Sequence, residues 1–156
     1  MIAPARKPLR LVLDTNVWLD WLVFADAGVA PIKAAVARGE AVIVMSAACE
    51  TELIRVLGYP LSGRALNADA QAAALAHCRA IACGTPDGFA PHAIHAITTL
   101  PRCKDPDDQM FLELARDSGA AALITKDRDL LSLASRKVQP LPFQIITPRE
   151  FARAHS

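Results

Sequence analysis

The sequence lacks an excess of charge of either sign. Its 156 residues include 17 basic and 16 acidic side chains, which leaves a formal net charge of +1. A chain with so weak a global field gives no indication from charge alone that nucleic acid or a membrane is its partner. Any such partner has to be inferred from local clusters of residues.

Paired cysteines and long apolar runs are also missing. The four cysteines do not form a CxxC pair, and no apolar run near the start is long enough for a signal peptide or a spanning helix. We therefore expect a protein of a reducing, bacterial-type cytosol with free, buried thiols. A zinc site would need ligands at a common spacing. The available cysteines and histidines do not have that spacing, so we interpret them as structural: His77, Cys78, Cys83, His92 and His95.

Hydrophobic residues, by contrast, are plentiful. They make up 53% of the chain, which at this length supports one domain with a substantial core. No internal repeat or low-complexity linker divides the sequence. We expect a single domain over residues 1–156, with its core at about 9–147 and a C-terminal helix within 148–156.

Strand and helix patterns alternate along this domain. Four short apolar runs, each ending in a polar residue, predict strands buried on both faces: Leu9–Asp14, Ala41–Ser46, Ala121–Lys126 and Phe143–Thr147. Helical patterns with capping or glycine stop signals occupy Ala30–Gly39, Ala47–Gly58, Asn67–Gly84, Asp105–Gly119 and Thr147–Ala154.

This alternation predicts an α/β fold, a three-layer α/β/α sandwich with a central, mostly parallel sheet of about four or five strands. The fifth strand would lie within His92–Leu100, and Tyr59–Leu66 is expected to be an exposed loop.

Acidic residues follow the predicted strands. In an open parallel sheet, the loops at the carboxyl ends of the strands converge on the functional crevice. Asp14 ends the first strand, Asp127 and Asp129 follow the third, and Glu50 and Glu52 lie on the helix after the second. The two glutamates flank the buried stripe of that helix on opposite sides, so the helical wheel alone does not choose between them.

A further acidic cluster, "CKDPDDQMF", begins the helix at Asp105–Gly119. Asp105 suits an N-cap, with Pro106 at the first helical position. Asp107 and Asp108 lie at the head of the apolar stripe of the helix, which predicts that both point toward the sheet. Attraction to the helix dipole explains acidic residues there but not their orientation toward a site that already holds Asp14.

Converging carboxylates repel one another and lose solvation, unless a divalent cation supplies the compensating charge. Oxygen ligands of this kind suit Mg²⁺ or Mn²⁺. Such ions can activate a water molecule and stabilise the leaving oxygen in phosphodiester hydrolysis. The sequence therefore suggests metal-dependent phosphoryl chemistry.

Four segments in the same order resemble a known family: "LVLDTNVWL" (Leu11–Leu19), "SAACETELIRVL" (Ser46–Leu57), "CKDPDDQMFLELA" (Cys103–Ala115) and "ALITKDRDLLSL" (Ala122–Leu133). Together they look like the successive signatures of PIN-domain ribonucleases. Within that family, the similarity points to the toxin components of toxin-antitoxin pairs, which are distantly similar to VapC toxins. The resemblance extends from about Leu9 to Thr147.

The resemblance implies roles for particular residues. The metal-binding and catalytic acids of the family would fall on Asp14, Glu52, Asp108 and Asp127, which selects Glu52 over Glu50 and Asp108 over Asp107. Hydrogen-bonding or auxiliary roles would fall on Thr15, Asn16, Asp107, Thr125 and Asp129. The resemblance also implies an RNA substrate, a homodimer and an antitoxin protein as inhibitor.

Basic residues near the acids could offset the negative field when RNA approaches. The candidates are Arg55, Arg64, Arg102, Lys104, Lys126 and Arg128.

Two other classes of protein share this fold class: another magnesium-dependent phosphatase or phospho-acceptor, and a binding module without activity. A haloacid-dehalogenase-like phosphatase needs a second aspartate where Asn16 stands, and a receiver domain needs its acceptor aspartate after a middle strand, where none is found. A catalytically silent RNA-binding or protein-binding module is the remaining alternative.

Overall fold

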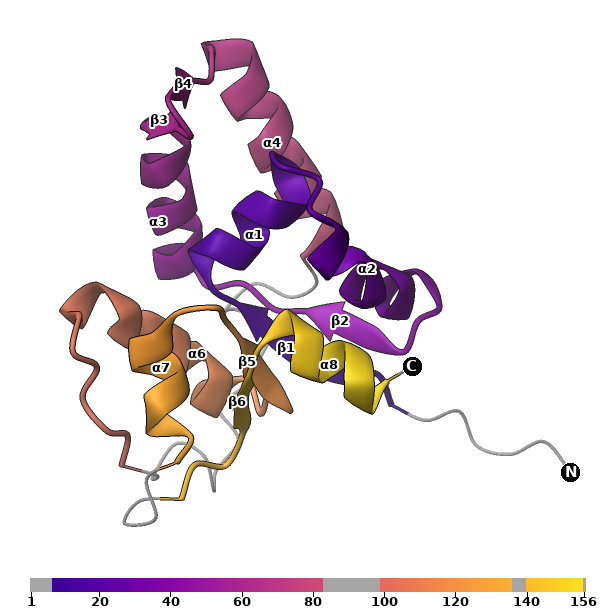
Figure 1. Ribbon diagram of the computed structural model, residues 1–156, viewed down its shortest axis with the longest axis vertical. Coiled ribbons are helices and arrows are strands. Elements are labelled where there is room, and N and C mark those ends of the chain that lie inside the picture. The colour runs from indigo at the N-terminus through magenta and orange to yellow at the C-terminus, as the bar shows by residue number, and fades with distance from the viewer. Residues whose placement is uncertain (1–6, 83–98, 136–139, 156) are drawn as a thin grey trace, which may run out of the picture.

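A parallel sheet of four strands forms the centre of the computed structural model, which describes residues 7–82, 99–135 and 140–155 (Figure 1). Its strands are β1 (Leu9–Leu13), β2 (Ala41–Ile43), β5 (Ala122–Ile124) and β6 (Gln144–Ile146). They are ordered β2-β1-β5-β6, and each neighbouring pair is parallel. The four predicted strands are therefore confirmed. Most of the segment proposed for a fifth strand, His92–Leu100, lies outside the described residues.

Helices cover both faces of this sheet. They are α1 (Thr15–Leu22), α2 (Ala30–Ala37), α3 (Ala47–Leu57), α4 (Ala68–Ile81), α6 (Gln109–Asp117), α7 (Arg128–Leu133) and α8 (Pro148–Ala154), with 3₁₀ turns η1 (Ala27–Val29) and η3 (Pro106–Asp108). None of the helices in the described part of the chain is both long and apolar enough to cross a membrane.

Alternation along β1 shows which helices lie on which face. The side chain of Arg10 donates to the carbonyl of Ser118, at the end of α6, with a distance of 2.7 Å. The neighbouring side chain of Leu11 lines a pocket together with Phe151 of α8. Since successive side chains in a strand point to opposite faces, α6 and α8 cover opposite sides. The predicted three-layer α/β/α sandwich is confirmed.

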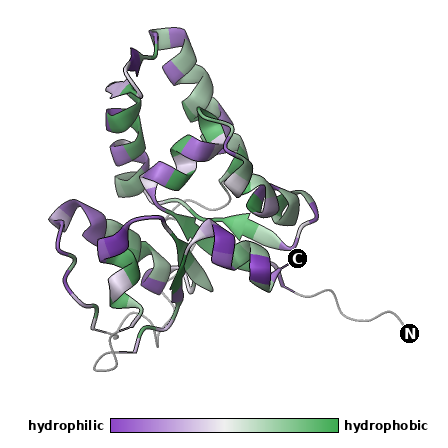
Figure 2. Ribbon diagram, viewed as in Figure 1, coloured by the Kyte–Doolittle hydropathy of each residue, from purple (hydrophilic) through white to green (hydrophobic). Residues whose placement is uncertain are grey.

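The sheet is buried on both of these faces. Val12, Leu123 and Ile145 are register partners on the α6 side, and Leu13 and Ile124 point to the other side; all five are at most 4% exposed. Burial on both faces explains why the strands are continuous apolar runs rather than alternating ones. Figure 2 shows the same apolar sheet at the centre of the molecule.

The predicted helix boundaries also correspond to real caps. Asn67 accepts a hydrogen bond from the backbone N–H of Ala70, and Thr147 forms a capping box with Glu150. Asp105 caps the turn that contains Pro106 as predicted, but this first turn is the 3₁₀ helix η3, and α6 begins only at Gln109. The predicted helix from Asp105 to Gly119 is therefore divided at its start.

The segment from Tyr59 to Leu66 differs from the predicted loop. It contains a short antiparallel hairpin of β3 (Pro60–Leu61) and β4 (Arg64–Ala65). The two turn residues, Ser62 and Gly63, have φ angles of 51° and 79°, the conformation that tight hairpin turns require. With α3 and α4, the hairpin forms an arm that extends away from the sheet (Figure 1).

Candidate active site

Asp14 lies where β1 ends and α1 begins, and it is only 4% exposed. One carboxylate oxygen accepts a hydrogen bond from the backbone N–H of Val17 at 2.9 Å, and the other accepts one from the hydroxyl of Thr125. Burial raises the pKa of Asp14, while these two hydrogen bonds act in the opposite direction. Asp14 therefore caps α1 and is also a fixed, buried carboxylate at the carboxyl edge of the sheet.

Thr125 connects this carboxylate to the backbone of a second acid, Asp127. Thr125 directly follows β5, the strand that pairs with β1, and its side chain is fully buried. Its hydroxyl oxygen donates to Asp14 and accepts from the backbone N–H of Asp127 at 2.9 Å. Asp127 in turn caps α7, because its side chain accepts from the N–H groups of Asp129 and Leu130 at 2.8 and 3.2 Å. A single hydroxyl thus holds the two loops that carry Asp14 and Asp127.

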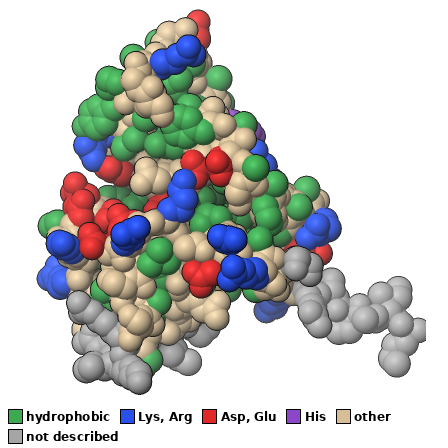
Figure 3. All heavy atoms as spheres, in the orientation of Figure 1, with side chains coloured by type: hydrophobic (Ala, Val, Ile, Leu, Met, Phe, Trp, Pro, Cys, Tyr) green, Lys and Arg blue, Asp and Glu red, His purple; other side chains and the backbone are tan. Residues whose placement is uncertain are grey.

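Asp108 is the third acid at this edge. Partial burial, followed by the charges of Asp105, Asp127, Asp14 and Asp107, raises its pKa to about 6. Asp127 and Asp14, from two other segments of the chain, are thus close enough for their charges to act on Asp108. Figure 3 shows acidic side chains gathered where α6 and α7 begin, with lysine and arginine side chains beside them.

Asp107 does not behave as its position on the helical wheel predicted. Its side chain is exposed, whereas Asp108 is half-buried. The reason is the 3₁₀ geometry of η3: the wheel of a regular α-helix does not give the directions of its side chains. Asp129 is exposed in the first turn of α7.

The two glutamates of α3 have different partners. Glu52 forms an ion pair with Arg55 on the same helix, and Glu50 forms one with Arg79 of α4 at 2.7 Å. Glu52 also raises the pKa of the Cys49 thiol, as does Glu113 of α6, although burial is the main cause of that shift. Glu50 thus points to α4. Glu52 lies near Cys49, whose thiol is also within reach of the charge of Glu113 on α6.

Two polar residues follow Asp14 at the start of α1. The hydroxyl oxygen of Thr15 is buried and has no hydrogen-bond partner within the described part of the chain. Asn16 is exposed. The unpaired buried hydroxyl beside Asp14 leaves an oxygen that can accept or coordinate a further group.

Lys126 is held by an acid that the sequence analysis missed. Its ammonium group pairs with the carboxylate of Asp20 on α1, which is only 8% exposed. The charge of Lys126 also acts on Asp14, lowering the pKa that burial raises. One sequence signal could have revealed this residue: Asp20 is the only charged residue in the apolar helix segment "TNVWLDWL".

The remaining basic candidates are exposed. Arg64 lies on the hairpin of the arm, Arg102 and Lys104 precede η3, and Arg128 begins α7. Lys104 and Arg128 are therefore next to the acidic edge in the chain, while Arg64 is carried by the arm.

An all-oxygen set of carboxylates fits Mg²⁺ or Mn²⁺ in its donor chemistry. Burial, with a smaller contribution from neighbouring acids, raises the pKa values of Asp14 and Asp108. Yet among the residues that the structure describes, no three acidic, histidine or cysteine side chains lie close enough together to enclose an ion. The donor types fit such a cation, but the side chains as they stand do not close around it.

The predicted structural role of the cysteines and histidines is only partly visible. Cys49 and Cys78 are buried free thiols, and Cys103 is a half-buried one. Cys83, His92 and His95 lie outside the described residues.

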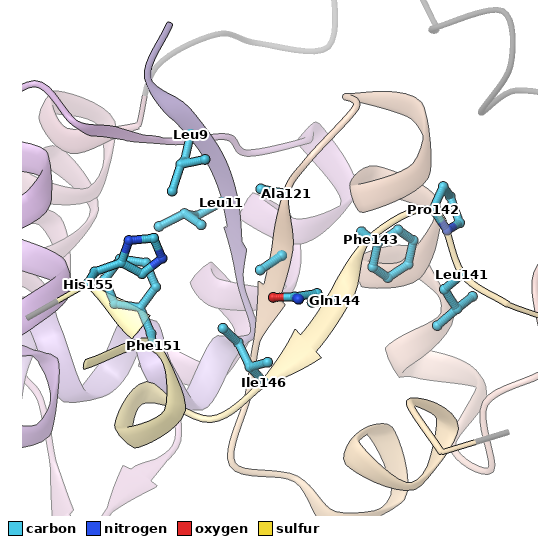
Figure 4. Close-up of a pocket in the computed structure, with 11 residues that line it drawn as sticks. Leu9, Leu11, Ala121, Leu141, Pro142, Phe143, Gln144, Ile146, Phe151 and His155 are labelled. Atoms are coloured by element: carbon cyan, nitrogen blue, oxygen red, sulfur yellow. The ribbon is translucent and has the colours of Figure 1, made fainter. Parts of the chain in front are cut away.

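A pocket in the described structure lies apart from this acidic edge. It has a volume of about 450 Å³ and lies on the face of the sheet that carries α8 (Figure 4). Leu9, Leu11 and Ile146 form part of its wall, and the stacked rings of Phe151 and His155 form another part. No acidic residue occurs among the described residues of its lining.

Comparison with known families adds to this geometry. A family model described as PIN domain matches residues 10–129, which is more than half of the chain. The chain belongs to the PIN domain family. PIN domains are generally nucleases, so this one is expected to act on nucleic acid. The match includes Asp14, Glu52, Asp108 and Asp127. Searches among curated proteins and solved structures found no match.

Proposed function

We propose that this PIN domain is a metal-dependent endoribonuclease that hydrolyses RNA phosphodiester bonds. The observation that carries the proposal is the convergence of Asp14, Asp108 and Asp127 on one edge of the sheet. Partial burial there, followed by the charges of neighbouring acids that include Asp127 and Asp14, raises the pKa of Asp108 to about 6. Carboxylates brought together at such a cost of repulsion are characteristic of functional sites.

In this proposal, Asp14, Glu52, Asp108 and Asp127 hold Mg²⁺ or Mn²⁺. When bound, such an ion supplies positive charge that lowers the pKa of an attacking water and stabilises the leaving oxygen. Thr125 keeps Asp14 and Asp127 in place through its two hydrogen bonds. Thr15 and Asn16, at the start of α1, supply hydroxyl and amide groups, and Asp107 and Asp129 add negative charge at the rim.

Basic side chains would bring the RNA to this acidic edge. Lys126 is held near Asp14 by Asp20, and Lys104 and Arg128 adjoin the acids in the chain. Arg55 and Arg64 would contact the RNA farther along the arm. Contacts of this kind, to the phosphates of the backbone, determine affinity rather than sequence preference.

The test uses a single-stranded RNA that carries a fluorophore and a quencher, incubated with the protein and Mn²⁺ or Mg²⁺. We expect cleavage by the wild type and its loss in Asp14→Asn or with EDTA. Equal rates for the wild type and Asp14→Asn, or with and without EDTA, would reject the proposal. Glu40→Gln is the control, because Glu40 is an exposed residue directly before β2 and its carboxylate lies far from the acidic edge. This variant should cleave as the wild type does.

A toxin role rests on the sequence resemblance. We propose that the chain is the toxin of a toxin-antitoxin pair in the cytosol, that it forms a homodimer and that an antitoxin protein inhibits it. Expression without the neighbouring gene should arrest growth of the host, and Asp14→Asn should relieve the arrest. Normal growth at high expression of the wild type would contradict toxicity, and a monomeric mass in solution would contradict the dimer.

One observation favours the silent module as a second candidate. Both carboxylate oxygens of Glu52 are engaged by Arg55, so that this acid is not available as the structure stands. A silent module would bind RNA or protein but show neither cleavage nor a dependence on Mn²⁺, and the same assay therefore separates the two functions.

A further inference from the structure

Arg55 holds Glu52 at two points. Its Nε donates to one carboxylate oxygen of Glu52 at 3.0 Å, and one terminal nitrogen donates to the other oxygen at 2.5 Å. The other terminal nitrogen donates to the hydroxyl oxygen of Tyr59 at 2.6 Å. The guanidinium group thus occupies both oxygens of Glu52 and has a separate anchor on the residue that leads into the hairpin.

This pair is exposed enough to exchange. The side chain of Arg55 is 48% exposed, and that of Glu52 is 17% exposed. Ion pairs near the surface contribute little to stability, because water screens them and two long side chains lose freedom. The anchor to Tyr59 does not involve Glu52, and the guanidinium also lies 5.4 Å from the centre of the tyrosine ring. Arg55 therefore keeps a partner when Glu52 leaves it.

Glu52 lies on a helix that packs against the start of the acidic edge. Helix α3 packs against α1 and α6, the helices that begin directly after Asp14 and Asp108. The thiol of Cys49 on α3 feels the charge of Glu113 on α6 as well as that of Glu52 on α3. Glu50, in contrast, is tied to Arg79 of α4.

From these contacts we infer that Arg55 competes with the divalent cation for Glu52: it holds the carboxylate when the cation is absent and gives it up when the cation binds. The inference rests on the proposed function, because it requires a cation at the acidic edge. The competition lowers the affinity of the site for the metal, and Arg55 stays on Tyr59 when Glu52 leaves it. Arg55 is thus a positioning residue in this account.

The test measures Mn²⁺ affinity of the metal-free protein, without RNA, by calorimetry and by the electron paramagnetic resonance signal of free Mn²⁺. Arg55→Ala should bind Mn²⁺ about two- to fivefold more tightly, the factor typical of a partly exposed ion pair. Arg55→Lys keeps the charge but loses the two-point contact, so its affinity should lie between those of the wild type and Arg55→Ala.

Two control variants lose the same charge elsewhere. Arg79→Ala frees Glu50, and Arg38→Ala removes a similar two-point pair with Glu40, at 3.0 and 3.1 Å, remote from the acidic edge. Both should bind Mn²⁺ as the wild type does. An unchanged or weaker affinity in Arg55→Ala would overturn the inference, and so would an equal gain in Arg79→Ala or Arg38→Ala.

Asp14→Asn separates failure of this inference from failure of the proposed function. If Asp14→Asn and the wild type bind Mn²⁺ equally, or neither binds it, the proposed metal site is wrong, and the inference fails with it. If binding depends on Asp14 but not on Arg55, only the competition is wrong.

In the unmodified protein, the nuclear magnetic resonance signal of the Arg55 Nε–H should shift when Mg²⁺ is added. A signal that does not move at saturating Mg²⁺ would also contradict the competition.

Discussion

Replacing Thr125 by valine should disrupt the acidic edge without changing the shape of the core. Valine has the same branched shape as threonine but lacks the hydroxyl that donates to Asp14 and accepts from the N–H of Asp127. Because the side chain of Thr125 is fully buried, water cannot replace these two hydrogen bonds.

The cost can be estimated from the two bonds. A hydrogen bond to a charged group contributes about 1.5–3 kcal/mol, and a partly buried N–H left without a partner costs about 1 kcal/mol. We therefore expect Thr125→Val to lower the free energy of unfolding by about 2–4 kcal/mol, a large share of the roughly 5–15 kcal/mol typical of a domain. The pKa of Asp14 should rise further, because the bond from Thr125 lowers it in the wild type.

The assay is urea denaturation in EDTA at neutral pH, followed by the fluorescence of the two buried tryptophans, Trp18 and Trp21. Thr125→Ser is the matched control, since it keeps the hydroxyl and loses only a methyl group, at about 1 kcal/mol. Ser118→Ala removes another buried hydroxyl, whose oxygen has no partner within the described residues, and should have little effect. A loss in Thr125→Val no greater than that in Thr125→Ser would refute the reasoning.

Three further predictions follow from the charges. Because the pKa of Asp108 is raised from 3.8 to about 6, its contribution to stability is fully present below about pH 4 and is lost as the pH rises through 6. In EDTA, the unfolding free energy of the wild type minus that of Asp108→Asn should therefore fall over this pH range. A difference that stays constant would contradict the shift. Lys126→Met should destabilise the protein more than Asp20→Asn in urea denaturation, because only the first leaves a buried charge without its partner; the reverse order would contradict the pairing. Arg64→Ala should leave the free energy of unfolding unchanged. In RNA titrations at several salt concentrations, the slope of log affinity against log salt concentration should become shallower by about one. An unchanged slope would show that Arg64 does not contact the RNA.

Much of the fold could be predicted because local patterns and burial agree. The strands are continuous apolar runs, since helices cover both faces of the sheet, and Asn67 and Thr147 cap the helices that their sequence predicts. The hairpin at Pro60–Ala65 was not predicted, because two residue pairs give too short a pattern to separate from a loop. The exposure of Asp107 was also missed, because η3 does not follow α-helical geometry.

The candidate site shows the same division. Asp14 and Asp127 could be brought to one edge by a rule about parallel sheets, because that rule depends only on where each strand ends. Asp108 was placed there with Asp107 by the helical wheel, and only the family resemblance selected it. The partners of the other charged residues could not be predicted. Lys126 was a candidate for RNA contact, and Asp20 was not considered at all, yet the two form a pair between α1 and the segment after β5.

The amino-acid order alone determined the α/β class, the positions of the strands and the acids that follow them, since these depend on periodicity and on neighbours in the chain. Only the tertiary structure decided which charges meet. Thr125 joins Asp14 to the backbone of Asp127. Glu50 pairs with Arg79 of α4, whereas Glu52 pairs with Arg55 on its own helix. A helical wheel gives the direction of a side chain around its own helix, but the energy of a charge depends on the elements that folding places beside it.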